Sequence, residues 1–496
     1  MEGLRIATLG SHQVLGEALS EIASHLGIEE FPCEMEEADH LILIGDVEAP
    51  ETGQTDVTRI LLLDDGVRIT DARDRDGGVP SDLQEYGLCV VGASLALQEV
   101  LRIQGCMRQI DIVKAYVAVH YRIDARDAGE GFLAERDLQI RDRTGSSLPL
   151  FVKGREDGTG HLVVSGRLSD ERLVRELLEE VDLESCLDSP EMQPSTLELR
   201  IPRQTGHVRG DATVAGVGGL GSWALDVFSR GLADSGSNGA GVGVTILDPD
   251  PEIELHNLNR QVLYSAKDIG RPKAGAAVDV LSGVIPEADF AWGIQSLGIP
   301  ELETIISGST GFEDDDEAVD LGVCDSILPS EELRERILSS GVILSGVDNL
   351  RSRAIISGMS SSLGIPMINA GAAGWSGQMD VIREGDGCMT CRYGSGIARD
   401  DRVASCQEDG EIPFSSIVTS TAIFGALQGL ALMAALSERG RILSEWPGRI
   451  LWGGRSNSVR VEMGRVRGVF GSGGDHLAHI REALGMDPEA VGDNSQ

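Results

Sequence analysis

The segment GVGGLGS, residues 216–222, is the most informative part of this chain. The short apolar run Thr213–Ala215 leads into it, and the run Trp223–Phe228, which has helical character, leads out of it. A strand, a glycine turn and a helix in this order are the context of a nucleotide-binding fingerprint. The segment therefore predicts an α/β domain that binds a nucleotide.

Each glycine of the turn has a mechanical reason. Gly216 permits the tight turn, Gly218 lets the backbone approach a phosphate, and Gly221 allows close packing of the helix, whose N-terminus faces the anion. A second predicted strand, 243–247, ends at Asp248, whose carboxylate is placed to accept ribose hydroxyls. The glycine- and serine-rich stretch 231–243 between them is predicted to be a surface loop.

Charged residues downstream of the turn indicate phosphoryl chemistry. Negative charge accumulates on phosphoryl oxygens during attack at phosphorus, so catalysis there depends on positioning and on cations. Arg260 and Lys273 supply positive charge, and Asp348 is suited to hold Mg²⁺. Lys273 stands out because only four of the 42 basic residues are lysines. These downstream charged residues predict that a triphosphate is cleaved at the site.

From Gly216 to about Leu436 the chain resembles the ubiquitin-activating enzyme superfamily, of the ThiF and MoeB adenylyltransferase type. The matching motifs are the glycine turn with Gly219, Asp248-x-Asp250, Asn257-Leu258-Asn259-Arg260-Gln261, Gly270-x-Pro272-Lys273, Val347-Asp348-Asn349 with Arg353, Asn369-Ala370-Gly371 with Gly377-Gln378, and Cys388-x-x-Cys391. The resemblance implies a Rossmann-like α/β fold with a mixed sheet.

The same resemblance implies ATP-dependent activation of a carboxylate as an acyl-adenylate. By position, the glycines and Asp248 would hold adenosine and phosphates, and Asn257, Arg260 and Lys273 would bind the triphosphate. Asp348 would hold magnesium, and Asp250, Gln261 and Asn349 complete the expected cofactor-binding set.

The expected substrate is the tail of a ubiquitin-like or sulfur-carrier protein, or a small carboxylic acid. A homodimer is expected as well. Two alternatives stay open from the residues alone. One is an NAD-dependent oxidoreductase, for which loss of Lys273 would make no difference, and the other is a non-catalytic nucleotide-binding scaffold.

The cysteines suggest a zinc site. Cys388 and Cys391 have the spacing of half a tetrahedral Zn²⁺ site, and no cysteine follows Cys406. His476 and His479 are candidates for the other half, with a solvated helix face as the competing interpretation of that pair. For Cys388 and Cys391, the alternative to a zinc site is a turn that has lost its metal.

Cys406 matches the position at which sulfur-transferring members of the resembled superfamily carry a reactive cysteine. Arg399 and Arg402 would lower the pKa of its thiol, whereas Glu408 and Asp409 would raise it. Catalytic thiol transfer and a structural role both remain open for Cys406.

Composition restricts the partners. The net charge of -38 argues against a surface that wraps nucleic acid and against an anionic membrane partner. The uncharged stretch 412–437 is long enough to span a bilayer, but its serines, threonines and glutamine favour a core helix. With no secretory signal at the start of the sequence, a cytoplasmic location is expected.

Four regions are predicted. Alternating strand and helix signals indicate an α/β domain over residues 1–108, and its single Gly10 turn predicts no second ATP site. Residues 109–200 are predicted to be an α+β domain with a charged helix at 170–181. The adenylation domain is placed at 205–484, and residues 485–496 are expected to be a disordered tail.

Overall fold

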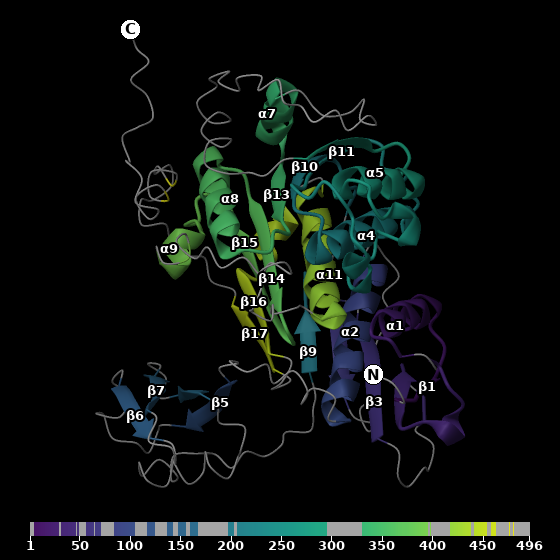
Figure 1. Cartoon of the computed structure of the whole chain (residues 1–496), viewed down its shortest axis with the longest axis vertical. Helices are drawn as coiled ribbons and strands as arrows, with labels where there is room; N and C mark the ends of the chain where they lie inside the picture. The colour runs from purple at the N-terminus through teal and green to yellow at the C-terminus, as the bar shows by residue number, and fades with distance from the viewer. Residues whose placement is uncertain are drawn as a thin grey trace. The chain divides into compact units, whose positions relative to one another are not determined.

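The computed structural model of the chain contains two compact units (Figure 1). The first unit combines residues 1–104 with 197–496, and the second comprises 105–196. The structure describes residues 4–28, 31–45, 47–48, 56–63, 65–70, 84–104, 117–124, 136–141, 147–154, 159–166, 197–202, 206–294, 330–394, 397, 417–437, 441–453, 458–462, 476 and 480.

The first unit is built around an eight-stranded mixed sheet, called here the large sheet. Its order is β12-β11-β10-β13-β14-β15-β16-β17; the first five strands are parallel and the last three antiparallel. The bounds of its strands are β10 Gly210–Ala215, β11 Val242–Leu247, β12 Asp289–Gly293, β13 Val342–Ser345, β14 Met367–Ala373, β15 Ser376–Ile382, β16 Arg449–Gly453 and β17 Ser458–Glu462. The predicted α/β fold with a mixed sheet is confirmed.

Helices cover both faces of the large sheet. Their bounds are α4 Gly219–Asp234, α5 Lys273–Val284, α7 Ser330–Ser339, α8 Leu350–Leu363, α9 Met389–Tyr393, α11 Val418–Ala435 and α12 Arg441–Glu445, with 3₁₀ turns η5 Leu255–Asn259 and η6 Ala266–Asp268. α7 and α8 pack on one face around Ile343 and Met367. α11 packs on the other face, where Gly377 of β15 leaves room for Phe424.

α11 is a core helix, as its serines, threonines and glutamine indicated. Among the described residues it alone is long and apolar enough to cross a membrane, yet 94% of that window is buried inside the protein. Its neighbour α4 continues to Asp234, with Gly231 and Leu232 buried. The loop predicted for 231–243 is therefore shorter than expected, because the apolar Leu232 extends the helix into the core.

The N-terminal part of the first unit forms a five-stranded sheet, called here the N-terminal sheet, of order β1-β2-β3-β4-β9. Its elements are β1 Ile6–Leu9, α1 Gln13–His25, the 3₁₀ turn η1 Met35–Glu37, β2 His40–Ile44, β3 Asp56–Leu63, β4 Gly66–Thr70, α2 Glu85–Ile103 and β9 Leu197–Arg200. The alternation of strands and helices that was predicted for this region is observed. In the structure this sheet lies in the same compact unit as the large sheet and includes β9, which the sequence analysis had placed in the middle region.

The second unit contains a four-stranded antiparallel sheet of order β5-β8-β7-β6. Its strands are β5 Val117–Asp124, β6 Arg136–Arg141, β7 Ser147–Gly154 and β8 Thr159–Gly166. The helix predicted at 170–181 and the tail predicted at 485–496 lie outside the described residues.

Replacing Gly425 of α11 with alanine should destabilise the first unit by about 1–3 kcal/mol, because overpacked cores must shift. An added Cβ would lie 2.7 Å from the carbonyl oxygen of Leu220 and would also collide with Trp223, both on α4. Denaturant unfolding measures the change. Gly16→Ala on α1 is the matched control, since nothing lies within 4 Å of its added Cβ. It should stabilise by about 0.4–1 kcal/mol; equal effects of the two substitutions would contradict the packing of α11 on α4.

Candidate functional site

The candidate site lies where the strand order of the large sheet reverses direction. β10 has β11 on one side and β13 on the other, and all three are parallel. Ligands of open α/β sheets bind beyond the carboxyl ends of the strands at such a switch point. The glycine turn follows β10, Asp248 follows β11 and Asp348 follows β13, so the topology brings the three predicted segments to one edge.

The glycine turn has the shape that the sequence predicted. Gly216 has φ of 87°, and a Cβ there would lie 2.9 Å from the backbone of Gly346 and Val347, just after β13. Gly221 leaves no room for a side chain against the carbonyl oxygen of Gly216. Gly218 is the N-cap of α4 and provides no side-chain hydrogen bond. Because no side chain caps this end, the first N–H groups of α4 are suited to an anion.

Asp248 holds the turn in place. Its carboxylate accepts hydrogen bonds from the backbone N–H of Val217, at 2.7 Å, and of Asp250, at 2.9 Å. Burial raises the pKa of Asp248, while the positive charge of Lys273 opposes that rise. The residue predicted to bind ribose thus also ties β11 to the glycine turn.

Lys273 is the first residue of α5, and its ammonium group forms an ion pair with Asp250. The lysine side chain is only 7% exposed, whereas that of Asp250 is 57% exposed. The hydroxyl of Tyr264 lies 2.9 Å from the carbonyl oxygen of Val217 and 3.1 Å from that of Lys273. Tyr264 therefore fixes the start of α5, with its cation, against the glycine turn.

Arg260 lies directly beside the turn. A Cβ on Gly219 would be 3.6 Å from both Cγ and Cδ of Arg260. The backbone carbonyl of Arg260 accepts a hydrogen bond from Trp223 of α4 at 3.1 Å. Asn257 forms a capping box with Glu254 and so shapes η5, the 3₁₀ turn whose C-cap is Arg260.

Gln261 contributes a buried amide at the same place. Its side chain is 2% exposed, and its Nε2 lies 3.9 Å from the position of a Cβ on Gly218. Its Oε1 is buried without a hydrogen-bond partner in the described structure. Buried polar atoms are normally paired, so an unpaired amide oxygen beside an uncapped helix N-terminus suits a site that takes a polar ligand.

The acidic side of the site follows β13. Asp348 is exposed, and its Oδ1 accepts a hydrogen bond from Asn349 at 3.3 Å. Asn349 is the N-cap of α8, because its Oδ1 accepts from the N–H of Ser352 at 2.7 Å. The buried Arg353 donates from Nε and Nη2 to the carbonyl oxygen of Val347, at 2.9 and 2.7 Å. Burial lowers the pKa of Arg353 to about 10.

Two structural contributors were not assigned a role from sequence. Tyr264 and Trp223 hold the segments that carry Lys273 and Arg260, and neither belongs to a motif. The sequence offers a faint signal for Tyr264, an aromatic residue three positions after Gln261 in a chain with only five tyrosines. Trp223 is indistinguishable in sequence from any core residue of an amphipathic helix.

A second cluster brings together residues far apart in sequence. Cys388, Cys391 and His476 offer ligand atoms that all lie within 4.8 Å of one another. The two Sγ atoms are 3.7 Å apart, and Sγ of Cys391 is 3.6 Å from Nδ1 of His476. The neighbouring sulfur of Cys391 and burial raise the pKa of Cys388. Three of the four predicted zinc ligands thus meet, and His479 lies outside the described residues.

α9, which carries Cys391, is anchored on the large sheet. Arg392 donates to the buried Asp380 at 2.7 Å, and the hydroxyl of Tyr393 donates to the same oxygen at 2.5 Å. On α8, a Cβ at Gly358 would collide with Ile480, so the segment of His476 packs closely on that helix. Cys406 lies outside the described residues, and its role stays a prediction.

Comparisons with known proteins find relatives of the segment that carries the candidate site. Residues 208–447 match the family described as the ThiF family. The chain is 25% identical over 198 residues to the sulfur carrier protein ThiS adenylyltransferase of Escherichia coli (strain K12), covering 40% of this chain and 63% of that protein. It is 22% identical over 239 residues to the SAMP-activating enzyme E1 of Haloferax volcanii, covering 48% and 70% respectively.

Among solved structures, that of E. coli MccB with ATP is similar at 17% identity and a TM-score of 0.35, covering 52% of this chain and 64% of that one. The chain spans less than two thirds of the length of the ThiS adenylyltransferase.

Proposed function

Because residues 208–447 belong to the ThiF family, we propose that this chain uses ATP to adenylate a carboxylate. The name "ThiF domain" is used below for this segment. One observation carries the proposal. Where the strand order of the large sheet reverses, the helix N-terminus at Gly218, which no side chain caps, lies beside the cations Arg260 and Lys273. The redox alternative requires no such cations, because hydride transfer leaves the pyrophosphate intact.

The reaction follows from the charges at the site. A carboxylate oxygen of the substrate attacks the α-phosphorus of ATP, the bond from that phosphorus to the bridging oxygen of the β-phosphate breaks, and pyrophosphate leaves. Both reactants are anions, so Arg260 and Lys273 must offset their repulsion while the turn holds the phosphates in line. On nucleotide entry, phosphate oxygens would compete with Asp250 for the ammonium group of Lys273.

Magnesium is part of this proposal. Asp348 is exposed in the segment that follows β13, and this segment contacts the glycine turn through Gly346 and Gly216. Carboxylate oxygens are ordinary Mg²⁺ ligands, and Mg²⁺ usually also takes oxygens of substrate phosphates. Bound there, the ion would neutralise charge on the leaving pyrophosphate. Arg353 would position Asp348 through its two hydrogen bonds to Val347.

A structural zinc ion is also proposed, held by Cys388, Cys391 and His476 with a fourth ligand from His479. The chemistry of this donor set fits Zn²⁺, which favours four sulfur and nitrogen ligands. The ion would clamp the segment of His476 onto α8 and α9 and would take no part in the reaction. Its support is the clustering of three ligand atoms from positions 85 residues apart.

The substrate is proposed to be the C-terminal carboxylate of a ubiquitin-like or sulfur-carrier protein, or a small carboxylic acid. The relatives support the first class, since one of them is a sulfur carrier protein ThiS adenylyltransferase. Thiol transfer at Cys406 and a cytoplasmic location remain predictions from sequence.

The test of this function is direct detection of the product. The full chain is incubated with ATP, Mg²⁺ and fractionated cell extract, and acyl-AMP species are sought by mass spectrometry. We expect a fraction that yields an acyl-AMP and also supports exchange of labelled pyrophosphate into ATP. If no extract fraction supports exchange although the protein still binds ATP, the scaffold alternative would be favoured. A peptide acyl group ending in Gly-Gly would identify the ubiquitin-like branch.

A further inference from the structure

The N-terminal sheet repeats part of the large sheet. Its order β1-β2-β3-β4-β9 corresponds to β10-β13-β14-β15-β16, and in both the first three strands are parallel and the last two antiparallel. In both, a helix follows the first strand and a mostly apolar buried helix follows the hairpin of the third and fourth strands. These helix pairs are α1 with α2, and α4 with α11. The match is one of topology and chain order together.

The correspondence extends to single residues. Gly10 follows β1 with φ of 107°, and Gly216 follows β10 with φ of 87°. The last paired residues before them are Leu9 with Leu43 in one sheet and Ala215 with Ser345 in the other. A Cβ on Gly10 would collide with the carbonyl oxygen of Ile44, and one on Gly216 would approach Gly346. Both glycines thus occupy the same position beside the end of the next strand.

The N-terminal copy lacks the segments that carry the nucleotide chemistry. Only residues 26–39 connect α1 to β2, whereas β11, α5 and β12 intervene between α4 and β13. Asp248, Arg260 and Lys273 all lie in the part that has no counterpart. The second unit, 105–196, is inserted between α2 and β9, where the ThiF domain has only a short connection from α11 to β16.

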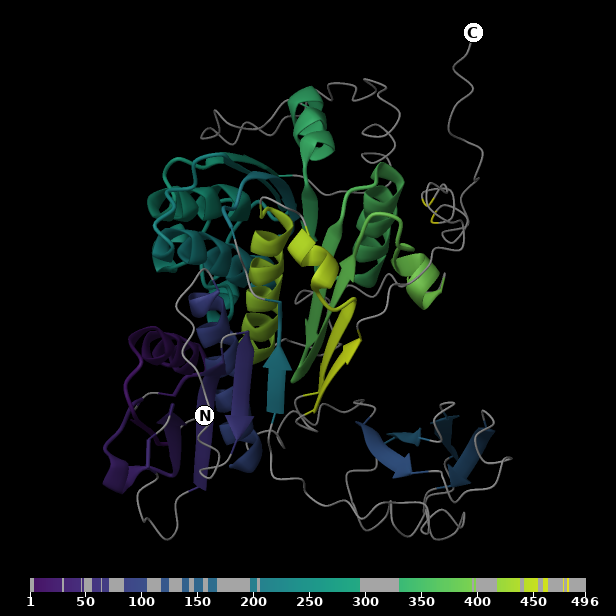
Figure 2. The same ribbon diagram turned by 180° about the vertical axis from the view of Figure 1, so that it is seen from behind.

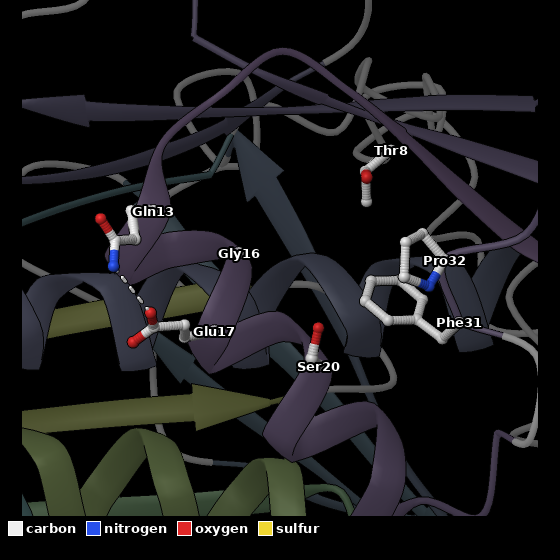
Figure 3. Close-up of a pocket in the computed structure, with 7 residues that line it drawn as sticks. All are labelled: Thr8, Gln13, Gly16, Glu17, Ser20, Phe31 and Pro32. Atoms are coloured by element: carbon white, nitrogen blue, oxygen red, sulfur yellow. Dashed lines mark hydrogen bonds between the residues drawn. The ribbon is translucent and has the colours of Figure 1, made fainter.

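The turn of the N-terminal copy is also closed to an anion. His12 caps α1, because its Nδ1 accepts a hydrogen bond from the N–H of Leu15 at 3.2 Å. A pocket lies beside α1 (Figure 3), and no Lys or Arg is among the lining residues in the described part of the chain. Its charged group is Glu17, which accepts a hydrogen bond from Gln13 at 3.1 Å. A phosphate there would meet a carboxylate.

The two copies pack together through corresponding helices. α2 lies beside α11 (Figure 2). α2 also contacts α4, and α1 contacts α11. These two contacts become each other when the two copies are exchanged. Two copies related by a two-fold axis make contacts of this kind. An element of one copy contacts its counterpart in the other, and every other contact occurs twice with the copies exchanged. Gly87 of α2 allows the close approach: a Cβ there would lie 2.6 Å from Leu430 and 2.9 Å from Val227.

Buried hydrogen bonds join the copies as well. The hydroxyl of Tyr86 on α2 donates to Asp226 of α4 at 2.8 Å. Gln98 donates to the carbonyl oxygen of Trp375 at 2.7 Å and accepts from Trp452 at 3.1 Å. These groups are buried, so separating the copies would expose apolar helix faces and leave paired polar atoms to be resolvated.

We infer that residues 1–104 with β9 are a shortened second copy of the adenylation fold, which binds no nucleotide and pairs with the ThiF domain within one chain. This copy covers the face formed by α4 and α11, which is therefore not available to a second copy of the chain. The chain is then a monomer with one ATP site, in place of the homodimer that the resemblance implied.

The pairing is tested with a disulfide between α2 and α11. A Cβ on Gly87 would lie 2.7 Å from Cγ of Leu430, so the pair Gly87→Cys and Leu430→Cys brings two Cβ atoms close to disulfide geometry. After oxidation we expect a link within one chain, at the 52.7 kDa position on a non-reducing gel and confirmed by peptide mapping. Covalent dimers joined through these two cysteines would overturn the inference.

Controls separate this link from the eight native cysteines. Each single variant should give no link between residues 87 and 430. The combination of Gly16→Cys with Leu430→Cys should also give no link to residue 430, because nothing lies within 4 Å of a Cβ added at Gly16. A double variant that keeps its cooperative thermal transition but forms no link would also overturn the pairing.

Two measurements on the unsubstituted chain do not depend on folding of a variant. Sedimentation velocity should give a 52.7 kDa species, and a stable dimer would overturn the inference. Calorimetric titration with a non-hydrolysable ATP analogue and Mg²⁺ should give one site per chain. Two sites would overturn the inference, whereas no site would overturn the proposed function and leave the internal pairing to the disulfide test.

Discussion

Replacing Lys273 with alanine is expected to lower acid-dependent exchange of pyrophosphate into ATP by about 10²–10³-fold, the usual cost of removing one group that stabilises transition-state charge. Lys273 is the buried cation at the start of α5, held beside the glycine turn by Tyr264. Its ammonium group has Asp250 as its partner before nucleotide binds. Loss of the ion pair with Asp250 should itself change stability little, because that aspartate is 57% exposed and remains hydrated.

The matched control is Lys267→Ala. Lys267 lies on η6, six positions earlier, and is exposed. Exchange should be unchanged in this variant, and the two proteins should unfold at similar denaturant concentrations. If Lys273→Ala kept wild-type exchange, the cation would not act on the triphosphate and the adenylation proposal would fail. Lys273→Arg should recover only part of the activity, since a planar guanidinium does not replace a compact ammonium group.

If the proposed zinc site is correct, the unsubstituted chain should carry one zinc ion per chain, and Cys391→Ser should lower this content to near zero. A serine hydroxyl is a poor replacement for thiolate at a tetrahedral Zn²⁺ site. Because the proposed ion would bind only the folded arrangement of Cys388, Cys391 and His476, its loss should also lower the melting temperature. Elemental analysis of protein purified without chelators gives the zinc content, and calorimetry gives the melting temperature.

Cys33→Ser is the matched control for the zinc prediction. Cys33, like Cys391, is partly exposed, and the candidate metal cluster found among the described residues does not include it. Its zinc content should equal that of the unsubstituted chain. A protein that binds no zinc before any substitution, or a Cys391→Ser variant that keeps the full content, would show that the cluster is not a metal site.

Residues of the site were predictable where their role depends on local geometry. The positive φ of Gly216 and the close contact at Gly221 depend on the strand, turn and helix that immediately surround them. Asn257 and Asn349 were predicted to bind the cofactor. In the structure each also has a role in the backbone: Asn257 forms a capping box, and Asn349 is the N-cap of α8. A motif alone does not separate a polar side chain that binds a ligand from one that also completes a backbone turn.

The cluster of Cys388, Cys391 and His476 was predictable only in part. The spacing of Cys388 and Cys391 indicates half a site, but the pairing with His476 depends on how a segment 85 residues later packs on α8. That packing needs Gly358 to leave room for Ile480. In the sequence, a glycine inside a helix carries no sign of the partner for which it makes space.

The sequence by itself determined the nucleotide-binding turn, the α/β class and the order of the acidic and basic groups along the chain. Periodicity, positive φ and residue spacing are local properties, so they can be recognised from one sequence. The tertiary structure alone decided that residues 1–104 pair with the ThiF domain and that β9 joins β4 across the inserted second unit. Those contacts join segments separated by a hundred residues or more, and complementary surfaces such as α2 against α11 leave no periodic trace along the chain.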